Sequence, residues 1–347
     1  MKTLFLLLAS AAWGGSFFDG DGRAPALPLP PREPAAAAAA KTPEAPTPDL
    51  VAARARVGNA AMLARVTPRA SGPFSFSVLG DAEGGRFPWE RVFAPGKGAF
   101  LEQWRAAQAG ADFVLQLGDF VSLGTVRNYR AHVAEVDAEA RAPLLRTIGN
   151  HDRSRPNGDA DKGLYDAVFG DRDWYFDHAG WRFVSLDSSD RKVTAAQLAW
   201  LASVLAVPGP KIVFTHVPPA YLRALKPLKE VGELSPAFIE DDEKGGPVHD
   251  FLTNYFADGA PEFESLVEKN GVKAVYMGHI HAFWAADHRG VRYVISGGGG
   301  SPLYPLPPGY PKKKFAHYLR VRAENGVLNE TVVPWKGAPF PLPPVKP

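Results

Sequence analysis

The chain contains no cysteine. Disulfide bonds, thiolate metal ligands, iron–sulfur clusters and cysteine nucleophiles are therefore excluded. It also has no large surplus of charge, because 39 lysines and arginines stand against 37 aspartates and glutamates. This balance does not indicate a nucleic-acid-binding surface. The nine histidines remain, so any metal site must be built from imidazole, carboxylate and amide groups.

The amino-terminal residues have the pattern of a secretory signal peptide. Lys2 is followed by the apolar run 3–9 and then by small residues at 9–12, and this run is too short to span a bilayer. We therefore expect residues 1–18 to be a signal peptide, and the mature chain to be secreted or periplasmic without a transmembrane span. A disordered start of a cytosolic protein and an uncleaved anchor are the alternatives.

The composition divides the rest of the chain into three parts. Residues 19–70 hold eight prolines between Pro25 and Pro48 and the alanine run 35–40, which predicts a disordered linker. Residues 334–347 contain six prolines and are expected to form an extended tail. Hydrophobic residues make up 46% of the 347 positions, enough to give the remaining segment, 71–333, a sizeable core.

Several strand-like apolar runs of this central segment end in polar residues. The five clearest are 74–79, 113–117, 144–148, 211–214 and 274–277. Helical spacing lies between several of them, which indicates an α/β fold with a largely parallel sheet. Later runs with short turns, such as 291–296 and 327–333, indicate antiparallel pairs added to that sheet or facing it.

The polar residues that follow the five runs are of metal-binding type. In chain order they are Gly80-Asp81, Gly118-Asp119, Gly149-Asn150-His151-Asp152, Thr215-His216 and Gly278-His279-Ile280-His281. One aspartate after a strand is most often a turn or a helix cap. Five such endings indicate one site, because working residues of open α/β sheets gather at the carboxyl ends of strands.

This ordered set of motifs resembles the calcineurin-like metallophosphoesterase superfamily, and within it the purple-acid-phosphatase-like branch. The resemblance covers about residues 71–301. It implies an α/β fold in the form of a four-layer α/β/β/α sandwich, with mixed sheets inside and helices outside. It also implies hydrolysis of phosphomonoesters or phosphodiesters, through a dinuclear metal centre and a metal-bound hydroxide. The expected partner is therefore a small-molecule phosphoester.

The resemblance also implies the metal ligands. Asp119 would bridge two metal ions, which in such centres lie about 3.5–4 Å apart and clamp both oxygens of an in-line displacement. Asp81 and His281 would complete the first metal site. The second site would be completed by Asn150, His216 and His279. These donors suit two divalent or trivalent ions of iron, zinc or manganese.

Two further motif residues are expected to be catalytic. By the resemblance, His151 would protonate the leaving oxygen. Asp152 could orient the His151 ring.

The first motif departs from the pattern of many superfamily members. They have Asp-x-His, whereas this chain has Asp81-Ala82-Glu83. Purple acid phosphatases use instead a tyrosine three residues after the bridging aspartate, and Ser122 stands at that position here. The first metal has therefore either lost a ligand or gained Glu83. An exposed loop glutamate is the alternative for Glu83.

A second class of function stays open at this stage. A non-catalytic or weakly active ligand-binding protein on the same fold would explain the weakened first motif. The intact motifs at 149–152 and 278–281 favour the hydrolase. The long insertion between His216 and His279 is where we expect a substrate-facing lid.

Overall fold

The computed structural model describes residues 42–82, 96–228, 255–301, 303 and 315–345. The chain divides into two units, Met1–Thr42 and Pro43–Pro347, and the architecture below is that of the second. The expected signal peptide, Glu83 and residues 229–254 of the expected lid lie outside the described residues.

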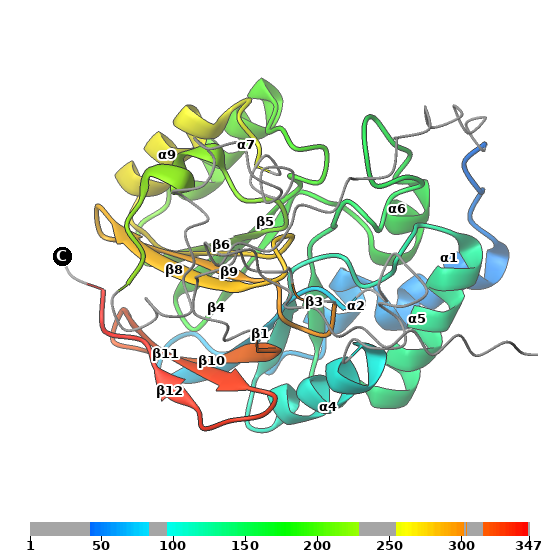
Figure 1. Ribbon diagram of the computed structural model, residues 1–347, viewed down its shortest axis with the longest axis horizontal. Helices are drawn as coiled ribbons and strands as arrows, with labels where there is room; N and C mark the ends of the chain where they lie inside the picture. Colours follow the sequence, from blue (N-terminus) through cyan, green and yellow to red (C-terminus); the bar gives the residue numbers. More distant parts are fainter. Residues whose placement is uncertain (1–41, 83–95, 229–254, 302, 304–314, 346–347) are drawn as a thin grey trace, which may run out of the picture. The chain divides into compact units, whose positions relative to one another are not determined.

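Two six-stranded mixed sheets form the centre of this unit (Figure 1). The first sheet has the order β12 (Phe340–Pro341), β11 (Val327–Pro334), β10 (His317–Glu324), β1 (Phe74–Leu79), β2 (Phe113–Gln116) and β3 (Leu144–Arg146). The second has the order β4 (Trp174–His178), β5 (Trp181–Leu186), β6 (Lys211–Thr215), β7 (Val272–Met277), β9 (Val291–Ser296) and β8 (Phe283–His288). The parallel pairs are β1–β2, β2–β3, β5–β6, β6–β7 and β7–β9.

Helices cover the outer faces of the two sheets. Over the second sheet lie α7 (Ala195–Leu205) and α9 (Ala260–Lys269), and α4 (Gly96–Gln108) packs on β1, β2 and β10 of the first (Figure 1). The remaining helices are α1 (Pro48–Val57), α2 (Asn59–Leu63), α5 (Val126–Glu139), α6 (Gly163–Phe169) and the 3₁₀ turn η1 (Ala220–Ala224). This arrangement confirms the predicted α/β/β/α sandwich. Within the described residues, no helix is long and apolar enough to cross a membrane.

Aromatic side chains join the inner faces of the sheets. Phe76 of β1 and Phe113 of β2 stack with their ring centroids 5.5 Å apart. Both rings meet Phe183 of β5 edge-on, at 5.4 and 5.2 Å. Edge-to-face contacts favour one relative placement of the rings. They therefore fix where the strand ends of one sheet stand against those of the other.

The ordered part of the chain begins earlier than the sequence analysis placed it. Residues 48–63 fall in the expected disordered linker, yet they form α1 and α2. Leu50, Ala53 and Val57 repeat at helical spacing and are each only 1% exposed. The burial of this apolar stripe stabilises a segment whose proline content alone predicts disorder.

Asn59 attaches these helices to the edge of the first sheet. Its Oδ1 accepts from the backbone N–H of Arg146 at 2.9 Å, and its Nδ2 donates to the Arg146 carbonyl at 3.0 Å. The side-chain amide thereby pairs with edge strand β3 as a neighbouring strand would. An unpaired edge would expose these backbone groups to other chains.

The proline-rich tail is also part of the sheet. β11 continues to Pro334, and Phe340–Pro341 pairs with it as β12. Leu342 is 6% exposed and belongs to the core. The backbone pairing of Phe340–Pro341 and this apolar contact hold the tail on the edge of the first sheet.

His317 at the start of β10 is buried, and we therefore expect part of the free energy of unfolding to be lost at acidic pH. Its burial lowers its pKa to about 4, whereas the ring has a pKa of about 6.5 when unfolded. Between these values the unfolded chain binds a proton that the native protein does not, so the free energy of unfolding falls as the pH falls. We expect a loss of about 3 kcal/mol from pH 7 to pH 4 from this residue.

Urea unfolding of the metal-free protein at pH 7 and pH 4 measures this effect. The control is His317→Gln, which cannot bind a proton in this range and should lose correspondingly less stability on acidification. Equal losses in the two proteins would contradict the assignment to His317.

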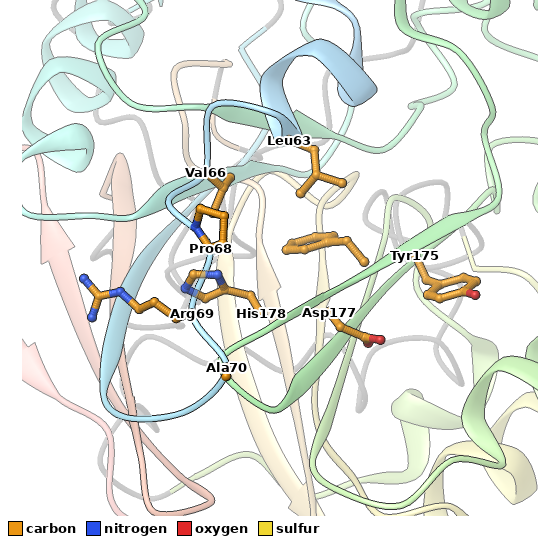
Figure 2. Close-up of a pocket in the computed structure, with 9 residues that line it drawn as sticks. Leu63, Val66, Pro68, Arg69, Ala70, Tyr175, Asp177 and His178 are labelled. Carbon is orange, nitrogen blue, oxygen red and sulfur yellow. The ribbon is translucent and has the colours of Figure 1, made fainter.

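A cavity of about 580 Å³ lies near the beginning of β1. Figure 2 shows Leu63, Val66 and Pro68, from the segment before β1, beside His178 and Tyr175 of β4. None of the predicted site residues lines it. It stands at the opposite end of β1 from Asp81, so it is separate from the site described next.

Candidate metal centre

The fold brings together the six described residues that were predicted to bind metal. They are Asp81, Asp119, Asn150, His216, His279 and His281, and all are buried. The first three follow β1, β2 and β3 of the first sheet, and the others follow β6 and β7 of the second. The site therefore lies where the carboxyl ends of parallel strands from both sheets meet, as such folds favour.

Backbone hydrogen bonds fix the loops that carry these residues. Ala82 N–H donates to the Asp119 carbonyl at 2.9 Å within the first sheet, and Gly278 N–H to the His216 carbonyl at 3.0 Å within the second. A backbone-to-carboxylate bond also crosses between the sheets, from the N–H of His279 to Oδ1 of Asp81 at 3.0 Å.

Four donor atoms of the second predicted metal site converge on one point. Asn150 Oδ1 lies 2.9 Å from His216 Nε2 and 2.8 Å from His279 Nδ1. The two ring nitrogens are 3.2 Å apart. Asp119 Oδ2 is also 3.2 Å from His216 Nε2.

The hydrogen bonds outside the cluster show which atoms face inward. His216 Nδ1 donates to the Leu117 carbonyl at 2.7 Å, which turns the Nε2 lone pair toward the cluster. Asn150 Nδ2 donates to the Pro156 carbonyl at 3.2 Å, which turns its Oδ1 the same way. Electron-rich atoms this close repel one another unless a cation or a proton lies between them. The donor set of oxygen and imidazole nitrogen therefore fits a metal ion.

The first predicted metal site has three described donors. Asp81, Asp119 and His281 each offer one atom, and these atoms lie within 4.8 Å of one another. His281 Nε2 is 3.6 Å from Asp81 Oδ1. Asp119 belongs to both clusters, which is the position required of a bridging carboxylate. Glu83 was the open alternative for a further ligand and lies outside the described residues.

The charges of the cluster favour metal uptake. Burial of Asp119 opposes its ionisation, but the positive charges of His216 and His151 lower its pKa below the usual range. Burial likewise opposes protonation of His216, but the carboxylate of Asp119 raises its pKa to about 9. A proton on His216 therefore balances Asp119 when no metal is present. A metal ion bound here would take over this role and release the proton.

Two of the predicted ligand residues have left-handed backbone conformations. The φ angle is +50° at Asp119 and +68° at His279. Non-glycine residues adopt this conformation at a cost, and it persists where surrounding contacts enforce it. The Asp152 carboxylate supplies such contacts at Asp119, because it accepts from the N–H groups of Asp119, Phe120, Val121 and Gly149.

These bonds correct the expected role of Asp152. Its two oxygens bind four backbone N–H groups of the β2 and β3 loops, so the carboxylate positions the loop of the proposed bridging residue. The His151 ring is oriented instead by the carbonyl of Ser122, which lies 2.9 Å from Nδ1. The backbone N–H of His151 donates to Asp119 Oδ1 at 2.8 Å, which places His151 beside both predicted metal sites.

The space around Gly149 is so tight that we expect even a small substitution there to weaken metal binding strongly. A Cβ atom at this position would lie 2.1 Å from Asp119 Oδ1 and 2.3 Å from Asp119 N. The methyl group of Gly149→Ala must therefore displace the proposed bridging carboxylate. We expect metal affinity to fall at least about tenfold, measured by competition with a chromogenic chelator.

The matched control is Gly98→Ala in α4, where an added Cβ meets no atom within 4 Å. This variant should bind metal as the wild type does. Equal metal affinity of the two variants would contradict the steric argument for Gly149.

A buried network of charges lies behind the Asn150 loop, and the sequence analysis did not predict it. Arg153, only 1% exposed, donates to the carbonyls of Asn150 and Pro156 and pairs with Asp190. Lys162 donates to Asp187 at 2.6 Å and to Asp190 at 2.8 Å. In the sequence, these charged residues lie in two segments that have the composition of ordinary polar loops, and nothing in their spacing indicates that they pair.

Comparisons with known proteins are consistent with this site. A family model described as calcineurin-like phosphoesterase matches residues 75–283. No curated protein matches the chain at a significant level of similarity.

Solved structures are similar to this chain at low sequence identity, and the first of the three named here shares its fold. The purple acid phosphatase PPD1 from yellow lupin (Lupinus luteus) seeds has a TM-score of 0.59 and 17% identity, over 79% of this chain and 54% of that one. The chain thus spans about half the length of the lupin enzyme. GAP50, the anchor in the inner membrane complex of Plasmodium, has a TM-score of 0.48 and 13% identity, over 80% and 90% of the two chains. A putative 5'-nucleotidase from Staphylococcus aureus has a TM-score of 0.42 and 16% identity, over 79% and 55%.

Proposed function

Because the chain belongs to the calcineurin-like phosphoesterase family, we propose that it hydrolyses small-molecule phosphomonoesters or phosphodiesters at the centre built around Asp119. The observation that carries the proposal is the pair of buried donor clusters that share this carboxylate. The donors suit two ions of iron, zinc or manganese. When bound, such ions supply Lewis acidity toward the phosphoryl oxygens and make a coordinated water more acidic.

Three residues of the chain would have different roles around these ions. Asp119 would hold both ions in place and offset part of their charge. Asp152 fixes the Asp119 loop through four backbone hydrogen bonds. His151 would supply the proton that the leaving oxygen needs. With Nδ1 donating to the Ser122 carbonyl, the proton would be transferred from Nε2.

The second candidate function is binding of a phosphoester without turnover. One observation favours it. The first metal site has three described donors, whereas the second has four. A first metal held more weakly would lower turnover while the second site still bound the ligand.

The location of the protein forms part of the proposal. The pattern of residues 1–18 supports secretion or export to the periplasm. Amino-terminal sequencing of exported material tests it, and a chain that still begins at Met1 would contradict cleavage.

The experiment that tests the function combines metal analysis with two substrates. The purified protein, loaded in turn with iron, zinc and manganese, is assayed with an aryl phosphate and with an aryl phosphodiester. Hydrolysis of either substrate that requires metal and disappears in Asp119→Ala supports the proposal. Two bound metal ions with no turnover of either substrate would favour the binding protein instead.

A further inference from the structure

A further group of metal-binding side chains lies away from the centre around Asp119. Glu264 and Glu268 belong to α9, and His288 is the last residue of β8. Each offers one ligand atom, and the three atoms lie within 4.8 Å of one another. We call these three residues the α9–β8 cluster. Neither the sequence motifs nor the comparisons assign a role to them.

The α9–β8 cluster lies at the opposite end of the second sheet from the proposed metal centre. His279 and His281 follow the end of β7, and β9 runs parallel to β7. His288 pairs instead with Val291, the first residue of β9. Because β9 has six residues, its two ends are roughly 17 Å apart at about 3.3 Å per residue. The two groups of donors therefore form separate sites.

The secondary structure brings the three side chains of the cluster together. Glu264 and Glu268 are four residues apart, so they lie on one face of α9. His288 and Val291 are directly paired, so their side chains share one face of the sheet. Val291 is buried in one core with Val267 of α9. His288 therefore lies on the sheet face that α9 covers, which Figure 1 shows beneath the helix.

The distances within the cluster match those between the ligands of one metal ion. His288 Nε2 lies 3.5 Å from Oε1 of Glu264 and 3.5 Å from Oε1 of Glu268. Zinc bonds of about 2.0–2.2 Å at tetrahedral angles place two ligand atoms roughly 3.4 Å apart. The imidazole nitrogen and both carboxylates are thus already spaced for a tetrahedral site.

The carboxylate of Glu268 is held with one oxygen turned toward His288. Arg289 Nη1 donates to the other oxygen, Oε2, at 2.9 Å. Oε1 is buried and has no hydrogen-bond partner among the described residues. Burial of an acceptor without a donor is costly, so a cation at this atom would be stabilising. Contacts such as that of Arg289 are typical of residues that orient metal ligands.

A buried phenol next to the cluster is a second, independent observation. Tyr293 of β9 is fully buried and lies two residues after Val291, on the face that α9 covers. Its ring meets that of Tyr221 edge-on, with the centroids 5.7 Å apart. Neither hydroxyl has a hydrogen-bond partner among the described residues. Burial raises the pKa of Tyr293, and the carboxylates of Glu268 and Glu264 raise it further. The hydroxyl therefore stays protonated and can donate to a water molecule on an ion bound by the glutamates.

The donor set indicates which ion the cluster would take. Imidazole nitrogen with carboxylate oxygens is a combination that zinc uses in sites with three protein ligands, where water is the fourth ligand. The side chains of His288 and Glu264 are partly exposed, so water can reach this fourth position. Magnesium and calcium prefer oxygen donors alone, so they fit the imidazole less well.

We propose that Glu264, Glu268 and His288 bind a zinc ion that joins α9 to the hairpin of β8 and β9. This site goes beyond the proposed function and does not depend on it, because it shares no residue with the centre around Asp119. The ion would offset the charge of the two carboxylates, which otherwise lie close together at one end of the sheet. Its role would be structural, with no catalytic step assigned to it.

The test measures zinc in variants of both elements, His288→Gln on β8 and Glu264→Gln on α9. Each full-length protein is equilibrated with a zinc buffer, and the zinc per chain is determined by elemental analysis. We expect both variants to bind one zinc ion fewer than wild type. Affinity at the site should fall by at least about 100-fold, because loss of a residue that only orients a ligand already costs about 10- to 100-fold.

The matched control is Glu262→Gln, the same kind of change on an exposed residue of α9. It should bind as much zinc as wild type. Zinc content that is equal in His288→Gln, Glu264→Gln and wild type would overturn the proposal. A protonated His288 paired with both glutamates would give this result. An equal loss in Glu262→Gln would overturn it too, because the ion would then depend on the charge of the helix and not on these donors.

The same count in Asp119→Ala keeps this site distinct from the proposed catalytic centre. The difference between Asp119→Ala and Asp119→Ala/His288→Gln should again be one zinc ion. Turnover of an aryl phosphate by His288→Gln should match that of wild type. A protein without turnover that still loses one zinc ion in His288→Gln would sustain this inference and reject the hydrolase. Turnover with no such loss would do the reverse.

Discussion

Asp119→Ala is expected to lose both metal ions and to lower kcat/KM by about 10⁴-fold or more. Among the residues that the structure describes, Asp119 is the one common to both buried donor clusters. Two cations a few ångströms apart repel each other strongly unless a shared anion lies between them. Removal of the carboxylate therefore affects both sites, whereas His216→Ala should empty mainly the second. Metal analysis after gel filtration measures the first effect, and turnover of an aryl phosphate the second.

Asp177→Asn on β4 is the control for the loss of one carboxylate. Its side chain is 58% exposed and pairs with Arg182 on the neighbouring strand, so metal content and turnover should both match wild type. Two tightly bound metal ions in Asp119→Ala would refute the bridging role. Far-ultraviolet circular dichroism of each variant excludes misfolding as the cause of metal loss.

His151→Ala is expected to keep its metal and to lose turnover by about 10²–10⁴-fold, the usual contribution of a positioned general acid. The loss should depend on the leaving group, because a nitrophenolate needs little protonation and an alkoxide needs much. An alkyl phosphate should therefore suffer more than a nitrophenyl phosphate. Metal content and kcat/KM of both substrates are measured on the same preparation.

His151→Asn separates proton transfer from support of the loop. The asparagine amide can still donate to the Ser122 carbonyl, as His151 Nδ1 does at 2.9 Å, but it cannot act as an acid. Activity as low as that of His151→Ala supports the acid role. Recovery to near the wild-type rate, or an equal loss on both substrates, would show that the ring acts only as a structural contact.

The cluster of predicted metal ligands was the part of the structure that the sequence predicted best. Its residues directly follow strands, and a strand end fixes where the next side chains lie, so chain order was enough to group them. The two-sheet sandwich was implied by the family resemblance, but the residue pattern did not show which strands belong to which sheet. A parallel run looks the same in either arrangement, because the pairing depends on contacts between distant segments.

The amino-terminal boundary was wrong because composition dominated the interpretation. The many prolines before residue 48 indicated a linker, although Leu50, Ala53 and Val57 have helical spacing. A stripe of three residues is too weak a signal by itself, and the partners of α1 lie on α5 and α6. Only the folded structure shows that burial offsets the ordering entropy here.

The role of Asp152 was wrong for a different reason. Its neighbour in sequence, His151, suggested a side-chain contact, but the carboxylate reaches back to the backbone of residues 119–121. Likewise, the pairing of Arg153 and Lys162 with Asp190 joins loops of separate sheets. Sequence spacing carries no information on side-chain contacts between residues that are so far apart in the chain.

The distribution of the ligands over both sheets has a consequence for the order of folding. Asp81 and His279, joined by a backbone-to-carboxylate bond, are 198 positions apart, and contacts of such long range form after local ones. A folding intermediate with only one sheet would present Asp119 and Asn150 without His216 and His279, or the reverse. We therefore expect metal binding at this site to be a late step of maturation. Bound metal would then report that the two sheets have packed together, and metal binding would not be the nucleus from which they fold.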